Sequence, residues 1–280
     1  MDDRREALDL DAEYDTSRQL PGGNVGAYFE AFDAASRDAR DAIAMTAAIR
    51  YGAHARESFD FFPAARPNAP LFVWVHGGYW RRMSKDQFSY VAPPIVAAGG
   101  AVAVLNYPLA PGPSLDEIVA AVRRGYDAAL AHATAVDGVP SRVIVGGHSV
   151  GAQLAASIAA ARRTGGLVAI SGLYDLQPLR STAINGWIAM DEACAARNSP
   201  LANPPVHAGP LVASVGDGEQ GEFHRQQRAY VAAWRAWSGE VREIDGAGLN
   251  HFSIVLELAR PQAPLTRATC ESLGLHTRSG

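Results

Sequence analysis

The sequence of 280 residues has only two cysteines, no cluster of basic side chains and no long apolar run. Cys194 and Cys270 match neither a metal-binding nor a redox spacing, which favours free thiols in a reducing compartment. The formal net charge of −4 argues against nucleic acid or an anionic membrane as a partner. No apolar stretch approaches the roughly 18 residues of a membrane span, and residues 1–6 lack the apolar segment of a signal peptide. We therefore expect a soluble cytoplasmic protein.

The centre of the chain alternates between short apolar runs and longer helix-prone stretches. Residues 71–75 are wholly apolar, as is typical of a strand covered on both faces of a sheet. Further strands are expected at 101–105, 142–145, 167–170, 211–215 and 240–244, with helices at 25–45, 87–98, 114–133, 152–163, 222–237 and 252–259 and a peripheral hairpin from 47–52 and 58–62. This alternation predicts an α/β fold, in which a mostly parallel central sheet carries helices on both faces.

The expected organisation is one large α/β domain over residues 24–260, which is long enough to bury a core. Residues 1–23 are polar and are predicted to form an N-terminal arm on the surface. Residues 174–209 contain four prolines, have weak periodicity and are too long for a simple connection. We expect a cap inserted over the site, although a plain surface excursion also fits. Residues 261–280 are predicted to be a C-terminal tail with at most one helical turn.

The sequence Gly-His-Ser-Val-Gly at 147–151 lies between an expected strand and an expected helix. G-x-S-x-G in this place is the pattern of a nucleophile elbow, a sharp turn that exposes the hydroxyl of the serine. Side chains at Gly147 and Gly151 would crowd the neighbouring strand and helix. The pattern also occurs in ordinary glycine-rich loops, but its position here predicts Ser149 as a catalytic nucleophile.

The first long strand is followed by His-Gly-Gly-Tyr-Trp at 76–80. Two glycines at the carboxyl end of a strand leave backbone N–H groups free to point at a ligand, although an ordinary turn has the same composition. We predict that the amides of Gly78 and Tyr79 form an oxyanion hole. The amide of Val150, which follows the nucleophile at a helix N-terminus, would add a third donor.

Bulky side chains beside this loop are candidates for the substrate pocket. Tyr79 and Trp80 are expected to wall the acyl pocket, and Tyr107 at the end of another strand is a further candidate. An aromatic wall favours a small acyl group such as formyl or acetyl. Arg81 and Arg82 either bind a substrate carboxylate or are solvated surface residues.

The general base is expected on a later loop, because the chain order of such triads is serine, acid, histidine. His251 follows the last expected strand and occupies that position. His76 and His148 each sit beside their own turn and are interpreted as structural. The acid should follow the preceding strand, where Asp217 and Glu219 are both available, and position alone does not choose between them.

Four motifs, HGGYW, GHSVGAQLA, SGLYDLQPL and GDGEQGEFHRQ, occur in this order. Together they resemble the arylformamidase (kynurenine formamidase) branch of the α/β-hydrolases, and HGGxW is the specific signal because the widespread esterase version is H-G-G-G. The resemblance begins weakly at residues 13–18 and runs to about residue 259. It implies an α/β-hydrolase fold and the hydrolysis of N-formyl-kynurenine to kynurenine and formate, with cleavage of small aryl esters in many members.

The resemblance also bears on the acid. The family segment G-x-x-D-S-P-E-F, aligned on Glu222 and Phe223, places the carboxylate at Glu219 rather than Asp217, with glutamate in place of the usual aspartate. The extra methylene moves the carboxylate outward, so the loop must compensate. This departure separates the chain from the animal enzymes and weakens the inference to their substrate.

The motifs together predict a serine hydrolase that transfers a small acyl group from an aryl amide or ester to water, with no metal and no organic cofactor. The partner is then a small-molecule substrate, and the oligomeric state, monomer or homodimer, stays open. One alternative is a small-substrate carboxylesterase or amidase with the same site. Another is a ligand-binding protein of the same fold without catalysis, because fold does not imply function.

Overall fold

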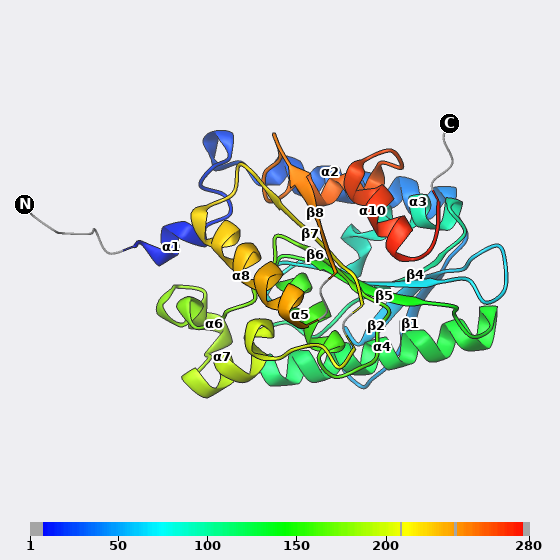
Figure 1. The fold of residues 1–280 in the computed structure, drawn as a ribbon, viewed down its shortest axis with the longest axis horizontal. Helices are drawn as coiled ribbons and strands as arrows, with labels where there is room; N and C mark the ends of the chain where they lie inside the picture. Colours follow the sequence, from blue (N-terminus) through cyan, green and yellow to red (C-terminus); the bar gives the residue numbers. More distant parts are fainter. Residues whose placement is uncertain (1–7, 208, 238–239, 277–280) are drawn as a thin grey trace, which may run out of the picture.

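The computed structural model describes residues 8–207, 209–237 and 240–276, which form a central sheet between two layers of helices (Figure 1). Its eight strands stand in the order β1-β2-β4-β3-β5-β6-β7-β8. Their bounds are Thr46–Arg50 (β1), Ser58–Phe62 (β2), Leu71–Val75 (β3), Ala101–Leu105 (β4), Val143–His148 (β5), Leu167–Ile170 (β6), Leu211–Gly216 (β7) and Val241–Gly246 (β8). β3 to β8 run parallel to one another, whereas β2 pairs antiparallel with both β1 and β4. The predicted α/β fold with a mostly parallel sheet is confirmed.

The described helices cover both faces of the sheet. Their bounds are Leu10–Glu13 (α1), Gly26–Ala42 (α2), Ala92–Ala97 (α3), Leu115–Asp137 (α4), Val150–Ala159 (α5), Asn185–Ile188 (α6), Glu192–Asn198 (α7), Gly221–Trp237 (α8), Ser253–Leu256 (α9) and Pro264–Ser272 (α10). Figure 1 shows α2, α3 and α10 on one side of the sheet and α4 and α5 on the other. No helix within the described ranges combines the length and apolar character needed to cross a bilayer.

The alternation of side chains along β3 explains the two layers. Leu71, Val73 and Val75 belong to the apolar cluster under α4, α5 and α8, while Phe72 and Trp74 belong to the cluster under α2, α3 and α10. Successive residues of a strand point to opposite faces, so a strand that is apolar at every position must be covered twice. All five residues are fully buried.

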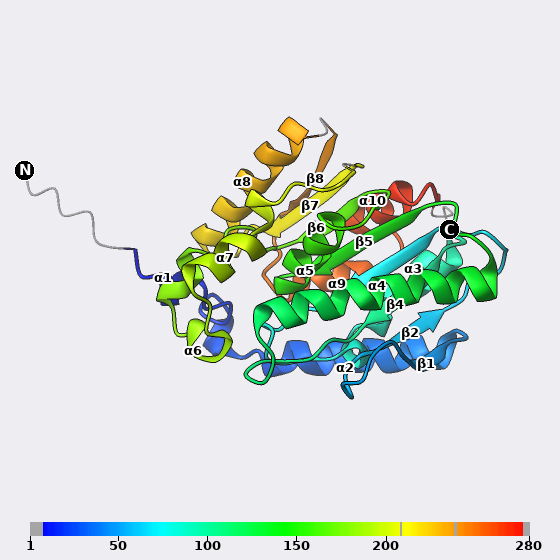
Figure 2. The same cartoon turned by 90° about the horizontal axis from the view of Figure 1, so that it is seen from below.

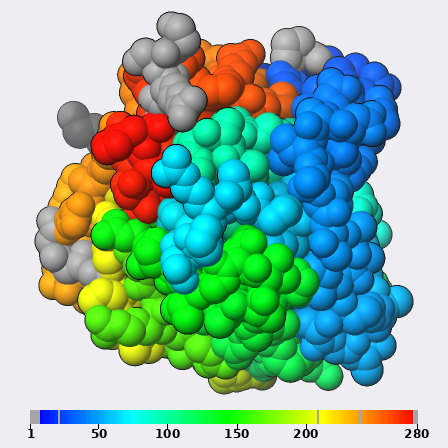
Figure 3. All heavy atoms as spheres, turned by 90° about the vertical axis from the view of Figure 1, so that its right-hand side faces the viewer, coloured from blue at the N-terminus to red at the C-terminus, as the bar shows by residue number. Residues whose placement is uncertain are grey.

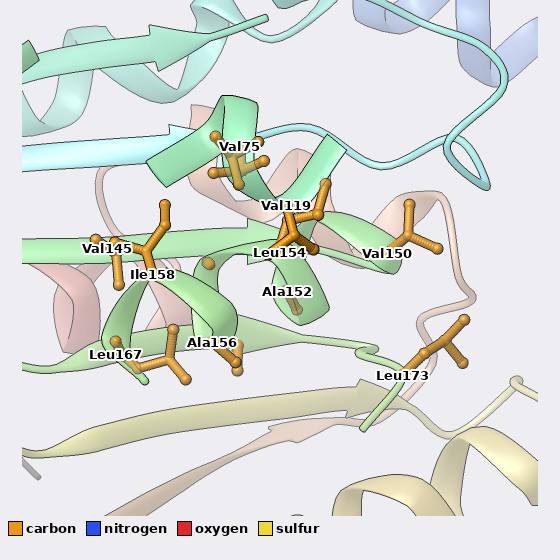
Figure 4. Close-up of a cluster of buried hydrophobic side chains, with 14 of the residues drawn as sticks. Val75, Val119, Val145, Val150, Ala152, Leu154, Ala156, Ile158, Leu167 and Leu173 are labelled. Carbon is orange, nitrogen blue, oxygen red and sulfur yellow. The ribbon is translucent and has the colours of Figure 1, made fainter. Parts of the chain in front are cut away.

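All ten residues of helix α5 are buried. Its alanines let it approach the sheet closely, while its larger side chains fill the remaining space. In Figure 4, Leu154 of α5 lies beside Val119 of α4, and Ile158 lies beside Val145 of β5. The nucleophile elbow is therefore anchored on a rigid element.

The structure refines one expectation about the edges of the fold and corrects another. The predicted hairpin forms at an edge of the sheet, where β1 is exposed, but β2 is buried throughout and pairs with β4 in the main sheet. The expected C-terminal tail contains α10, which Pro264 begins and which buries Leu265 and Cys270 against the sheet. Figure 3 shows α10, in red, packed beside residues from the middle of the chain. Helical spacing of its apolar residues was the signal for this helix.

The expected helix at 87–98 is broken into shorter pieces. Two 3-10 turns at Lys85–Gln87 and Ser89–Val91 precede α3, which begins at Ala92. Pro93 and Pro94 explain the boundary, because proline is tolerated only in the first turn of an α-helix. In contrast, the helix expected from residue 114 forms as α4, and the side chain of Ser114 caps it together with Glu117.

Residues 8–23 and 174–209 meet at one end of the molecule. In both Figures 1 and 2, α1 lies next to α6, at the end of α8. The carboxylate of Asp11 accepts a hydrogen bond from the amide of Ala183 at 2.6 Å. Tyr14 of the N-terminal segment is only 2% exposed, so this segment is packed into the fold more deeply than a surface arm.

Candidate active site

The turn between β5 and α5 has the geometry of a nucleophile elbow. Ser149 has φ 58° and ψ −128°, a combination that non-glycine residues rarely adopt. A Cβ at Gly147 would lie 2.2 Å from the carbonyl oxygen of Gly151, and a Cβ at Gly151 would lie 2.2 Å from that of Val75. The steric reason predicted for the two glycines is therefore confirmed. A strained serine backbone persists here because strand and helix hold it on both sides.

A glutamate from the loop after β7 and a histidine from the loop after β8 form a buried pair. Nδ1 of His251, after β8, lies 2.6 Å from Oε2 of Glu219, after β7. Both residues are at most 5% exposed. Because a carboxylate only accepts, Nδ1 of a neutral His251 carries the proton and Nε2 keeps its lone pair. His251 and Ser149 line the same cavity.

The second oxygen of Glu219 is held by two further donors. Oε1 accepts hydrogen bonds from the hydroxyl of Ser171 at 2.5 Å and from the amide of Gly216 at 2.8 Å. Ser171 follows β6 with φ 49°, so a strained backbone aims its side chain at the carboxylate. Sequence analysis missed Ser171. Its place at the carboxyl end of a central strand was the available signal.

Asp217, the other candidate acid, does a different job. It is exposed, and its Oδ1 accepts a hydrogen bond from the amide of Gly248 at 2.9 Å. It thus ties the loop after β7 to the loop after β8. The structure places Glu219, and not Asp217, against His251.

The loop after β3 contributes two residues to the lining of the same cavity. Gly78 has φ 110°, and a Cβ there would lie 2.2 Å from the carbonyl oxygen of Arg82. Gly78 and Tyr79 both line the cavity together with Ser149. Within the described ranges, no residue accepts a hydrogen bond from the backbone N–H of Gly78, Tyr79 or Val150. These three donors are free for a ligand, as an oxyanion hole requires.

The two other histidines near the turns are buried and differ in their surroundings. Nδ1 of His76 donates to the carbonyl oxygen of Gly77 at 2.7 Å, the ring stacks on Tyr107 at 4.3 Å, and burial lowers its pKa to about 4. The ring of His148 lies 4.5 Å from that of His251 and borders the cavity. Burial, followed by the charge of His251, lowers the pKa of His148 well below its usual value, so this ring stays neutral.

The cavity has a volume of about 440 Å³, a buried floor and an exposed rim. The floor contains Ser149 and His251 beside Phe32 and Phe252, and the rim carries charged side chains. Residues of the N-terminal segment and of the inserted segment complete the lining, namely Asp11, Tyr14, Asp15, Thr16, Ser17, Ala183, Ile184 and Trp187. Sequence analysis named none of these residues individually, although the cap expected over the site spans residues 174–209 and the family resemblance begins at residues 13–18.

The substrate-binding roles predicted for Trp80 and Tyr107 are wrong. Both side chains are fully buried, and neither is among the described residues that line the cavity. Trp80, with φ 56°, turns inward and donates from Nε1 to Gln153 at 3.1 Å. The hydroxyl of Tyr107 donates to the carbonyl oxygen of His76 at 2.8 Å. Both rings pack in the core, where their hydrogen bonds tie the HGGYW segment to Gln153 and Tyr107.

The elbow, the buried His–Glu pair and the free amides occupy the loops at the carboxyl ends of the strands, where α/β-hydrolases hold their active sites. A family model described as the alpha/beta hydrolase fold matches residues 72–254. The chain belongs to this family and is a hydrolase.

Two curated relatives are similar to this chain over most of its length. The chain is 29% identical over 285 residues to a kynurenine formamidase of Danio rerio, which covers 95% of this chain and 96% of that protein. It is 26% identical over 242 residues to a kynurenine formamidase of Drosophila melanogaster, with 78% of each chain covered. The predicted resemblance to the arylformamidase branch is confirmed.

Solved structures give the same fold. A Silicibacter protein assigned as a thioesterase superposes with a TM-score of 0.82 at 27% identity, covering 97% of this chain and 100% of that one. An esterase of Pyrobaculum calidifontis superposes with a TM-score of 0.73 at 15% identity, covering 89% and 91%. At the latter identity the likeness concerns the fold alone.

Proposed function

We propose that this protein is an arylformamidase-type serine hydrolase that removes a small acyl group, with N-formyl-kynurenine as the leading substrate. The observation that carries the proposal is the contact of His251 with Glu219 in the cavity that also holds the strained Ser149. The likeness to kynurenine formamidases over most of the chain supports the substrate. The unpaired, buried Cys194 and Cys270 support a cytoplasmic location.

In the proposed first step, Nε2 of His251 takes the proton of the Ser149 hydroxyl as Oγ attacks the carbonyl carbon of the substrate. Glu219 holds the ring in the tautomer that exposes Nε2 and stabilises the imidazolium that forms. The amides of Gly78, Tyr79 and Val150 donate hydrogen bonds to the oxyanion of the tetrahedral intermediate. The C–N bond then breaks, and His251 returns the proton to the leaving amine.

The second half of the reaction repeats these roles with water. His251 removes a proton from the water molecule, the hydroxide attacks the acyl carbon, and the bond to Ser149 Oγ breaks with return of the proton to Oγ. The products are the amine and a carboxylic acid, which is formic acid for a formyl substrate. In both steps His251 carries the proton, Glu219 stabilises the imidazolium, and the backbone amides stabilise the oxyanion.

The cavity fits an aryl substrate with a charged end. Phe29, Phe32 and Phe252 line it beside the reacting groups and offer an apolar surface to an aromatic ring. Arg82 is exposed at the rim and makes no ion pair with any residue that the structure describes. Its guanidinium can bind a carboxylate in bidentate fashion. This supports the option that Arg82 recognises a substrate carboxylate.

The direct test compares two substrates on the same preparation. We expect kcat/KM for N-formyl-kynurenine to exceed that for phenyl acetate by about tenfold or more, because only the former uses both the aromatic wall and the charged rim. The Ser149→Ala variant is the control for contaminating hydrolases. Faster turnover of the simple ester, with poor hydrolysis of the formamide, would favour a carboxylesterase instead.

A second candidate follows from the Silicibacter neighbour, because its assignment as a thioesterase accompanies a match over nearly the full length of both chains. The same nucleophile, base and oxyanion donors can cleave a thioester. A short acyl thioester should therefore be included beside the formamide and the ester. If kcat/KM is highest for the thioester, the substrate assignment changes while the serine mechanism stands.

A further inference from the structure

Tyr79 connects the HGGYW loop to two distant parts of the chain. Its hydroxyl donates to the backbone carbonyl oxygen of Tyr14 at 2.5 Å. Its own carbonyl oxygen accepts a hydrogen bond from Nε1 of Trp187 at 3.2 Å. One residue of the loop is thus tied to the N-terminal segment by its side chain and to the inserted segment by its backbone.

Tyr14 is itself held firmly. Its hydroxyl donates to Oε2 of Glu222 at 2.6 Å and accepts a hydrogen bond from Nε2 of Gln226 at 3.0 Å. Arg225 grips the same carboxylate with two nitrogens, at 2.6 and 2.8 Å. The tyrosine ring packs edge-on against Phe223 with the centroids 6.0 Å apart. The carbonyl that Tyr79 reaches therefore belongs to a residue that is anchored to α8 by its side chain.

The loop needs such an anchored residue because its backbone is strained. Tyr79 and Trp80 have φ 49° and φ 56°, in the left-handed region that residues other than glycine rarely adopt. Strain of this kind persists only where surrounding contacts impose it. Burial raises the pKa of both Tyr79 and Tyr14 well above the usual value, so both hydroxyls remain protonated donors.

We propose that the hydroxyl of Tyr79 is a positioning group. Through its hydrogen bond to Tyr14, called here the Tyr79–Tyr14 clasp, it aims the oxyanion amides at the cavity. The N-terminal segment then belongs to the catalytic apparatus and not only to the wall of the pocket. This inference rests on the proposed function, because it assigns the clasp to the oxyanion loop of that mechanism.

The clasp acts on the transition state more than on substrate binding. Donors aimed at the developing oxyanion contribute only when negative charge appears, so misaiming them lowers kcat and leaves KM nearly unchanged. Complete loss of one such donor typically costs about 10²–10³ in rate. Releasing the clasp displaces donors without removing them. A smaller effect of about tenfold follows.

The main variant is Tyr79→Phe, which keeps the ring and removes the hydroxyl. We expect kcat for an aryl formamide to fall about tenfold and KM to change less than about twofold. Tyr126→Phe is the matched control, because the Tyr126 hydroxyl also donates to a backbone carbonyl, that of Arg163 at 3.3 Å, and lies outside the cavity. Unchanged kcat in Tyr79→Phe, or an equal loss in Tyr126→Phe, overturns the clasp.

A double-variant cycle tests whether Tyr14 acts through Tyr79. Tyr14→Phe removes the anchoring bonds to Glu222 and Gln226 and should lower kcat by a smaller factor. Tyr14→Phe with Tyr79→Phe should equal Tyr79→Phe alone within about twofold, because the clasp can be lost only once. Multiplication of the two single effects would show that Tyr14 acts by another route and overturn the proposal.

Hydrogen exchange supplies a readout that is independent of turnover. The amides of Arg81 and Arg82, which both donate to the carbonyl oxygen of Gly78 at 3.0 Å, should exchange faster in Tyr79→Phe than in the wild type, while amides of α4 stay unchanged. Equal exchange in the two proteins contradicts the clasp. If the wild type hydrolyses no formamide, ester or thioester, the proposed function fails, and the exchange comparison still decides whether the clasp holds the loop.

Discussion

The hydroxyl of Ser171 donates to Oε1 of Glu219 at 2.5 Å, while Oε2 of the same carboxylate contacts His251. A glutamate side chain has one more rotatable bond than aspartate and therefore more orientations to choose from. Ser171 and the amide of Gly216 together remove that freedom. The resemblance to the arylformamidase branch implies an aspartate at this position, and these two donors compensate for the extra length of the glutamate side chain.

Ser171→Ala tests this compensation. The variant leaves the contact of Glu219 with His251 possible but no longer enforced. Because a hydrogen bond to a charged group contributes about 1.5–3 kcal/mol, we expect kcat to fall by about tenfold or more with KM little changed. Steady-state kinetics on one aryl formamide decide the matter, and full activity of Ser171→Ala would deny it a positioning role.

The identity of the acid can be settled by amide substitutions on its loop. Glu219→Gln should lower kcat by about 10³ or more, since the ring of His251 would lose the partner that fixes its tautomer. Asp217→Asn should retain activity within a factor of about three, because Asp217 binds the amide of Gly248 and no catalytic group. The reverse order of the two losses would reassign the acid.

Local sequence patterns were sufficient wherever the site is built by neighbours in the chain. The elbow around Ser149 could be predicted because any strand-to-helix turn of this kind brings backbone atoms too close to positions 147 and 151 for a side chain to fit. The loop position of His251 followed from chain order. By contrast, Asp217 and Glu219 share one loop, and only the fold decides which of them faces the imidazole. Here the family resemblance favoured Glu219, the residue that contacts His251.

Contacts between distant segments were beyond the reach of those patterns. Tyr14 and Glu222 meet across 208 positions of the chain, and no periodicity announces the pairing. The direction of a side chain at a strand end was equally hidden. Trp80 belongs to the loop at the carboxyl end of β3, where a side chain can face a substrate, yet its left-handed backbone directs the indole into the core. The loops that carry the nucleophile, the base and the acid were predictable, but the direction of individual side chains was not.

Arg82 offers a test of substrate recognition at the rim. Arg82→Gln removes the charge at a position without an ion-pair partner in the described structure. We expect KM for N-formyl-kynurenine to rise by about threefold to tenfold and KM for neutral formanilide to stay unchanged, because an exposed charge contributes modestly. Arg66→Gln is the matched control. Arg66 is exposed and precedes β3, so it lies near the amino ends of the parallel strands, opposite to the ends that carry the site. Equal changes for both substrates would exclude recognition of a substrate carboxylate by Arg82.

Glu222 couples the anchoring of Tyr14 to pH. Burial alone would raise the pKa of its carboxyl, but hydrogen bonds from Arg225 and Tyr14 lower it below the usual 4.5. A carboxyl with a lowered pKa stabilises the folded state above its unfolded pKa, and this contribution is lost as the pH falls through the folded value. The wild type should therefore exceed Glu222→Gln in free energy of unfolding by about 1–3 kcal/mol near neutral pH.

That excess should shrink steadily as the solution is acidified below the usual pKa of 4.5. Urea unfolding of both proteins at several pH values measures it, and the difference cancels the titration of the other carboxyl groups. Glu30→Gln makes the same chemical change at an exposed position of α2 and should leave the free energy of unfolding near neutral pH within about 0.5 kcal/mol of the wild type. A Glu222→Gln difference that stays constant down to about pH 3 would mean that the ionised carboxylate is not what anchors Tyr14.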